Sequence, residues 1–248
     1  MIFVAPGRLS LPDEKGIDIA RRCGLRSDSI YPLSLVHFIG KAHVYKGERF
    51  NSISHLLGAV AALSGTACLI VTAAQQGDPW KIVSFSIYGA SLIVLYLFST
   101  LYHSLRHAGK TVFQRLDHLA IYVLIAGTYT PFTLVTLKGT WGWSVFGTIW
   151  GLAVLGMALD VLLPKVRSIV SIAIYLVMGW LIVIAFAPLV RSLPTAGVFW
   201  LVLGGLFYTS GLCFYFFDKK VSHFHGIWHL FVMAGSISHY ATIFVYVA

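Results

Sequence analysis

Residues 82–103 read IVSFSIYGASLIVLYLFSTLYH, a run without a single Asp, Glu, Lys or Arg. The hydrocarbon core of a bilayer is roughly 30 Å thick, so an α-helix needs about 20 apolar residues to cross it. This run is long enough, and it is apolar throughout, whereas a transmembrane β-strand alternates apolar and polar residues. It therefore predicts a helix that spans a membrane.

Further runs of the same kind decide the class of the protein. Of its 248 residues, 58% are hydrophobic and 11% are charged, whereas a soluble domain carries about 25% charged residues. The runs predict an all-α, seven-transmembrane helix bundle. Its expected spans are about 53–75, 82–103, 117–137, 141–163, 168–190, 196–217 and 225–247. Short charged stretches, such as residues 106–115, are expected to be the breaks between them.

The distribution of positive charge predicts the orientation. Of the 18 Lys and Arg residues, only Lys81, Lys138 and Arg191 fall in the breaks after the first, third and fifth spans. Cytoplasmic segments are enriched in Lys and Arg, so we expect a cytoplasmic N-terminus and a C-terminus outside. Residues 1–45 are expected to form a basic cytosolic tail and residues 46–248 the membrane domain, in a multi-pass protein of the cell (inner) membrane.

The formal net charge of +9 does not indicate nucleic-acid binding. Lys and Arg in so apolar a chain more often face an anionic membrane surface, and no stripe combines basic with aromatic residues. The three cysteines, Cys23, Cys68 and Cys213, are scattered, so neither a disulfide framework nor a thiolate metal site is indicated. Membrane lipids are the expected partners.

Eight ionisable or hydroxyl side chains within the predicted spans share one property: each lies at the cytoplasmic end of its span. Such side chains are costly in a membrane and mark function by default. The topology therefore brings residues that are distant in sequence to one membrane level. They are His55, Ser99, His103, Asp117, His118, Asp160, His225 and His229.

The spacing within this group predicts a metal site. His225 and His229 lie four residues apart, which places both imidazoles on one helix face, and Ser99 and His103 share that spacing in another span. Two histidines from one helix and a third, His103, from a facing helix give three ligands and one open position, which is usual for catalytic zinc. We therefore expect a Zn²⁺ site of His103, His225 and His229.

Other interpretations stay open at this point. A haem held by His103 and either His225 or His229 is a second possibility. Helix-end residues can also have plain structural roles: His55 is expected to reach the lipid headgroups, and Asp160 to pair with Lys165 or Arg167. A retinal protein is excluded, because the last span has no lysine for a Schiff base.

Asp117 is the candidate general base. Soluble HExxH metalloproteases use a Glu beside the first histidine, but Gly226 occupies that position. Asp117 is expected at the same membrane level, and its neighbours Arg115 and His118 are potentially cationic. It can accept a proton from a metal-bound water or orient that water.

A polar cavity is expected to lead from this site toward the bilayer centre. Ser236 and His239 lie along the last span, about 15 Å deeper by the helical rise. Thr128 and Thr130 precede Pro131, which is expected to kink the third span. The alternative is that these polar groups only form hydrogen bonds between helices.

Four blocks of sequence resemble the bacterial hemolysin III family, which belongs with the progestin and adipoQ (adiponectin) receptors. They are ERFNSISHLLG at 48–58, Ser99 with His103, QRLDH at 114–118 followed by GTYTP at 127–131, and His225 with His229. The resemblance covers residues 46–248. It implies seven helices, zinc bound by the three histidines and a water, and Asp117 and Ser99 beside that water. It also implies kinship with alkaline ceramidases, whose zinc site hydrolyses lipid amides.

Three functions are therefore considered. The first is a zinc-dependent hydrolase of lipid amides or esters, in which Asp117 acts as base and Ser99 assists the oxyanion. The second is a non-enzymatic sensor of lipids or membrane state with a structural zinc ion. The third, a pore-forming cytolysin, is disfavoured because the chain has the pattern of a resident membrane protein.

Overall fold

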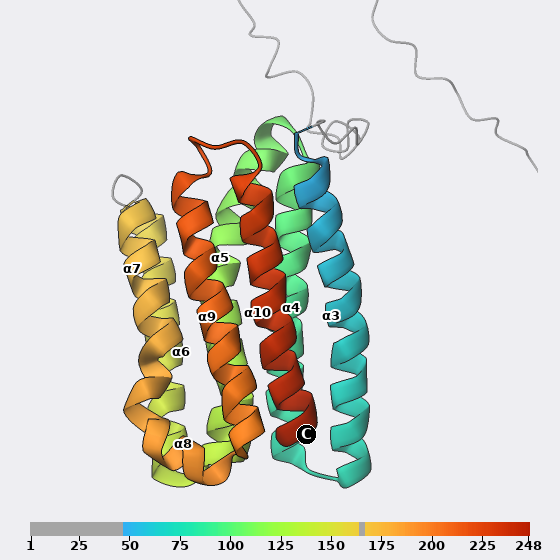
Figure 1. The fold of residues 1–248 in the computed structure, drawn as a ribbon, viewed down its shortest axis with the longest axis vertical. Helices are drawn as coiled ribbons and strands as arrows, with labels where there is room; N and C mark the ends of the chain where they lie inside the picture. The colour runs from blue at the N-terminus through green and yellow to red at the C-terminus, as the bar shows by residue number, and fades with distance from the viewer. Residues whose placement is uncertain (1–46, 164–166) are drawn as a thin grey trace, which may run out of the picture. The chain divides into compact units, whose positions relative to one another are not determined.

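The computed structural model describes residues 47–163 and 167–248. They form a bundle of helices that run up and down in chain order (Figure 1). The expected tail, residues 1–45, lies outside the described residues. The segments are α3 (Arg49–Gln76), α4 (Pro79–Ser104), α5 (His107–Pro131), η2 (Phe132–Leu137), α6 (Gly139–Leu162), α7 (Arg167–Trp180), η3 (Leu181–Ala185), α8 (Phe186–Ser192), α9 (Thr195–Phe217) and α10 (Phe224–Tyr246).

Six helical segments are long and apolar enough to cross a membrane. The all-helical prediction is confirmed, and each expected span coincides with a helix or a run of consecutive helical segments. Helix α10 has 23 residues but is not among the six, because its histidines and serines lower its mean hydropathy. The six are Arg49–Gln76, Pro79–Ser104, His107–Leu137, Gly139–Leu162, Val170–Ser192 and Thr195–Phe217.

The expected break at residues 106–115 is wrong for most of its length, because α5 begins at His107. Asp117 therefore lies almost three turns inside the helix rather than at its start. The first turns of α5 are polar, but they hold no proline to stop a helix. Apolar runs reveal where a helix enters hydrocarbon, whereas the helix itself continues into the polar zone.

Two proline residues change the helical geometry. At Pro131, where a kink was expected, the α-helix gives way to the π-helix η2, and the Thr133 hydroxyl donates to the carbonyls of Tyr129 and Thr130, both at 3.0 Å. Pro188 has no N–H for the Ile184 carbonyl, and the preceding segment Leu181–Ala185 is a 3₁₀-helix. Side chains thus satisfy backbone groups that a regular helix would pair internally.

Close packing at small residues holds the first helices together. Thr66 of α3 lies directly against Gly89 of α4, and Ser91 of α4 against Gly127 of α5. The largest fully buried side chains include Phe85, Tyr88 and Leu69. Small residues allow such approach where lipid supplies no hydrophobic driving force between helices. Helix α10 packs along α9 and also contacts α3 (Figure 1), which brings the last helix beside the first.

The Gly89 contact gives a test of this packing. A methyl group at Gly89 would overlap Cγ2 and Oγ1 of Thr66, whereas one at Gly151 of α6 meets open space. We expect Gly89→Ala to destabilise the protein by about 1–3 kcal/mol through overpacking, and Gly151→Ala to leave it unchanged or slightly more stable. Thermal unfolding of both variants in one detergent checks this; equal melting temperatures would contradict it.

Candidate metal centre

Three histidines from two helices meet at one end of the bundle. His103 is near the end of α4, and His225 and His229 are near the start of α10. One possible ligand atom from each lies within 4.8 Å of the others, and the Nε2 atoms of His103 and His225 are 3.3 Å apart. His103 and His229 are buried, with 1% and 2% of their surface exposed. The expected meeting of these histidines is confirmed, and the cluster could hold a metal ion.

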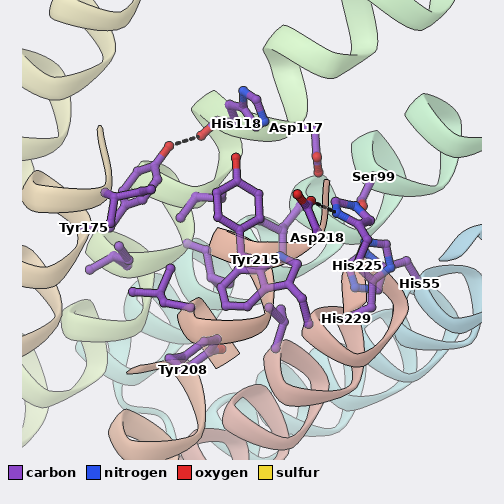
Figure 2. Close-up of a pocket in the computed structure, with 18 of the residues that line it drawn as sticks. His55, Ser99, Asp117, His118, Tyr175, Tyr208, Tyr215, Asp218, His225 and His229 are labelled. Carbon is purple, nitrogen blue, oxygen red and sulfur yellow. Dashed lines mark hydrogen bonds and ion pairs between the residues drawn. The ribbon is translucent and has the colours of Figure 1, made fainter. Parts of the chain in front are cut away.

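Two carboxylates lie against the rings of this cluster. Glu48 Oε2 lies 2.6 Å from His103 Nδ1, and Asp218 Oδ2 lies 2.8 Å from His225 Nδ1 (Figure 2). Carboxylates in this position fix the ring orientation and the tautomer of metal-binding histidines. Neither contact was expected from the sequence. The sequence offered only weak signals: Glu48 opens the first block that resembles the family, and Asp218 immediately follows the last residue of α9.

The surroundings of Glu48 favour the ionised form of its carboxyl group. The hydrogen bond with His103 holds the pKa of the Glu48 carboxyl well below its usual value, against the opposing effect of burial. The Lys110 ammonium, 2.7 Å from Glu48 Oε1, lowers that pKa further. Glu48 is therefore an acceptor at neutral pH, and His103 donates its Nδ1 proton to it.

The positions of the ring protons determine whether a metal ion fits between His103 and His225. When each Nδ1–H donates to a carboxylate, each Nε2 presents a lone pair, and two lone pairs face each other across 3.3 Å. A tetrahedral zinc ion with Zn–N bonds of about 2.0–2.1 Å separates two ligand nitrogens by roughly 3.3–3.4 Å. The imidazole donors and the spacing of this pair fit zinc, and the three ligand atoms as a set lie within 4.8 Å of one another.

Ser99 and Asp117 lie beside this cluster. Ser99 is one turn before His103 on α4 and is buried, and its hydroxyl interacts with the carboxyl of Asp117 on α5. Both residues line the same cavity as the three histidines (Figure 2). Ser99, Asp117 and the three histidines therefore share one cavity.

The cavity has a volume of about 650 Å³ and extends from the histidines into the bundle. Thr128 and His239 line it, as expected. Ser236 does not, because it joins the hydroxyls of Tyr96 and Tyr208, each at 2.8 Å. Nor does Thr130, whose hydroxyl oxygen accepts from Trp150 at 3.2 Å. Of these polar residues in the third and last spans, Thr128 and His239 therefore line the cavity, whereas Ser236 and Thr130 form hydrogen bonds between helices.

Two other polar residues, His55 and Asp160, are buried in contacts between helices. His55, expected at the headgroups, is instead 4% exposed, and its ring stacks on His229 with centroids 3.7 Å apart. Asp160 accepts hydrogen bonds from Tyr122 and Ser171 and so connects α6 with α5 and α7. Its expected partners are not tested, since Lys165 and the side chain of Arg167 lie outside what the structure describes.

A sequence model of the haemolysin-III related family matches residues 43–240, which is most of the chain. The chain belongs to this family. Its haemolysin-III relatives include Hemolysin-3 homolog of Bacillus subtilis (strain 168), 45% identical over 81% of this chain and 94% of the relative. Hemolysin-3 of Bacillus cereus is 41% identical over 82% of this chain and 92% of the relative.

The human monocyte to macrophage differentiation factor is a more distant relative, 31% identical over 79% of this chain and 82% of its own. The predicted resemblance to the hemolysin III family is therefore confirmed. Together with the six spanning-capable helices, these relatives identify the chain as a multi-pass membrane protein.

The metal-binding capacity of this haemolysin-III related protein can be measured directly. We expect detergent-purified protein to hold about one zinc ion per chain and His225→Ala to hold almost none, because two ligands do not make a stable zinc site. His118→Ala is the control, since His118 lines the cavity but is not in the cluster. Elemental analysis of the three proteins decides; equal metal contents in wild type and His225→Ala would refute the site.

Proposed function

We propose that this protein is a zinc-dependent hydrolase of lipid amides or esters, embedded in the cell (inner) membrane. One observation carries the proposal: a histidine cluster with carboxylate-oriented rings opens onto a cavity that also contains Asp117. A ligand chain in this cavity would extend along the bundle while its polar end stays near the histidines. Membrane lipids have this division between a long apolar part and a polar end.

Zinc is the proposed ion because all three donors are imidazoles, which suit zinc better than magnesium or calcium. His103, His225 and His229 would hold it. When bound, zinc would supply Lewis acidity, which polarises a carbonyl and lowers the pKa of a coordinated water to about 7. The position of Glu48 and Asp218 behind the rings supports this role, since such carboxylates raise the basicity of histidine ligands.

Asp117 is the proposed base. Its carboxylate would take one proton from water as the water oxygen attacks the carbonyl carbon of the substrate, and would return that proton to the leaving nitrogen or oxygen. The bond from the carbonyl carbon to the leaving atom breaks, and the products are a carboxylic acid and an amine or alcohol. The Ser99 hydroxyl interacts with Asp117; once Asp117 is protonated, this hydroxyl can donate to the oxyanion.

A sensor without catalysis is the second candidate. Its support is that the cluster connects the end of α4 with the start of α10, so a bound ion would tie two helices far apart in sequence. The same ion would then stabilise one arrangement of the bundle, and a lipid in the cavity would change that arrangement.

The hydrolase proposal predicts the behaviour of Asp117→Asn. We expect this variant to keep zinc, because Asp117 is not a ligand, and to lose hydrolysis by about 10²–10⁴-fold, because it lacks the base. Purified wild type and variant are incubated with mixed membrane lipids and the released fatty acid is measured by mass spectrometry. Release from neither protein, with zinc bound in both, would reject the hydrolase and favour the sensor.

We also propose seven spans with α10 as the last, a cytoplasmic N-terminus and an exterior C-terminus. The excess of Lys and Arg on one side supports this orientation, and it sets the histidine cluster at the cytoplasmic end. A C-terminal alkaline phosphatase fusion is then expected to be active and a C-terminal green fluorescent protein fusion dark. The opposite pair of results would contradict the orientation.

A further inference from the structure

Glu48 is the centre of a small hydrogen-bonded network next to the metal centre. Its Oε2 atom lies 2.6 Å from His103 Nδ1 and accepts from Asn51 Nδ2 at 3.2 Å. Its Oε1 atom lies 2.7 Å from Lys110 Nζ, and Lys110 also lies over the ring of Tyr102, 5.1 Å from its centroid. One carboxylate thus contacts a candidate ligand and an ammonium group at the same time.

We propose that Glu48 is a positioning residue of the metal centre: it aims His103 at the ion, and Lys110 moderates its effect on that ring. The inference rests on the proposed zinc site. His103 is the one ligand from α4, whereas His225 and His229 share α10, so the orientation of its ring decides whether three nitrogens converge. A carboxylate on Nδ1 leaves Nε2 as the only nitrogen available to the ion.

The two oxygens of the Glu48 carboxylate have different partners, His103 and Lys110, so Lys110 can influence His103 through Glu48. An ammonium close to the second oxygen draws negative charge away from the oxygen that faces His103. Removing the ammonium therefore strengthens the pull of Glu48 on the Nδ1 proton and makes the ring a better electron donor. Although Lys110 and Glu48 form an ion pair, their variants are expected to differ: loss of the Glu48 carboxylate weakens metal binding, whereas loss of the Lys110 ammonium does not.

The competing explanation is a purely structural ion pair. Glu48 immediately precedes α3 and Lys110 belongs to the first turn of α5, so their contact could simply tie these two segments together. In that case Glu48→Gln and Lys110→Met would lower the melting temperature alike and would change metal affinity alike. Metal affinity, rather than activity, separates the two explanations.

The experiment uses the full chain, purified in detergent and stripped of metal by a chelator. Zn²⁺ affinity is measured by competition with a chromophoric chelator, and the visible spectrum of the Co²⁺-loaded protein reports the ligand field. We expect Glu48→Gln to bind Zn²⁺ 10–100-fold more weakly with an altered Co²⁺ spectrum. We expect Lys110→Met to bind at least as tightly as wild type.

Two further variants serve as controls. Asp218→Asn is expected to weaken binding like Glu48→Gln, since Asp218 has the same relation to His225. Asp78→Asn removes a carboxylate at the opposite end of α4, where Asp78 caps the helix by accepting from the backbone N–H groups of Trp80 and Lys81. Asn preserves such a cap, so the Asp78→Asn variant is expected to bind Zn²⁺ with the affinity of the wild type.

The outcomes separate the two levels of inference. Suppose that the wild type binds Zn²⁺. Either of two results would then overturn the role of Glu48 and leave the zinc site intact: an unchanged affinity in Glu48→Gln, or an equal loss of affinity in Glu48→Gln and Lys110→Met. Absence of binding by the wild type would overturn both. Melting temperatures of the metal-free proteins show whether each variant is folded, and Lys110→Met gives an independent answer if Glu48→Gln is not.

Discussion

The close approach of His103 and His225, with their Nε2 atoms 3.3 Å apart, is the contact on which the arrangement of the site depends. In the tautomers whose Nδ1 atoms donate to Glu48 and Asp218, the facing Nε2 atoms present lone pairs to each other, an arrangement that a cation between them would stabilise. The contact also requires the end of α4 to meet the start of α10. The packing of α10 on α9 and α3 makes that meeting possible.

Several polar groups deeper in the bundle have hydrogen-bond partners within the protein. The hydroxyls of Thr66 and Thr128 donate to carbonyls one turn earlier in their own helices, and His239 Nε2 of α10 lies 3.1 Å from the Leu201 carbonyl oxygen of α9. In hydrocarbon such groups must find internal partners.

Much of this organisation follows from the sequence, for physical reasons. Continuous apolar runs predict helices because hydrocarbon leaves no other partner for the backbone, and alternating direction along the chain places His103 and His225 at one level. The start of α5 at His107 could not be predicted in this way, because hydropathy marks the hydrocarbon and not the end of the helix. The stacking of His55 on His229 depends on tertiary contacts.

The roles of Glu48 and Asp218 were hidden for a different reason. Both lie at the ends of the apolar runs, where charged residues are ordinary and carry little information. Only the fold shows that their carboxylates turn inward onto ring nitrogens. A rule for similar chains follows: an acidic residue at the end of one helix is a candidate for the carboxylate partner of an inward-facing histidine on a neighbouring helix.

The proposed zinc ion would have a coordination that suits catalysis better than a structural role. The carboxylates of Glu48 and Asp218 face the histidine rings, and a dication among the imidazoles would lie close to both of these negative charges. Structural zinc sites usually have four protein ligands. In the described part of the chain this cluster offers three, and all three line the cavity that Asp117 also lines. A coordination position left for water or substrate, next to a carboxylate, is the arrangement that hydrolysis needs.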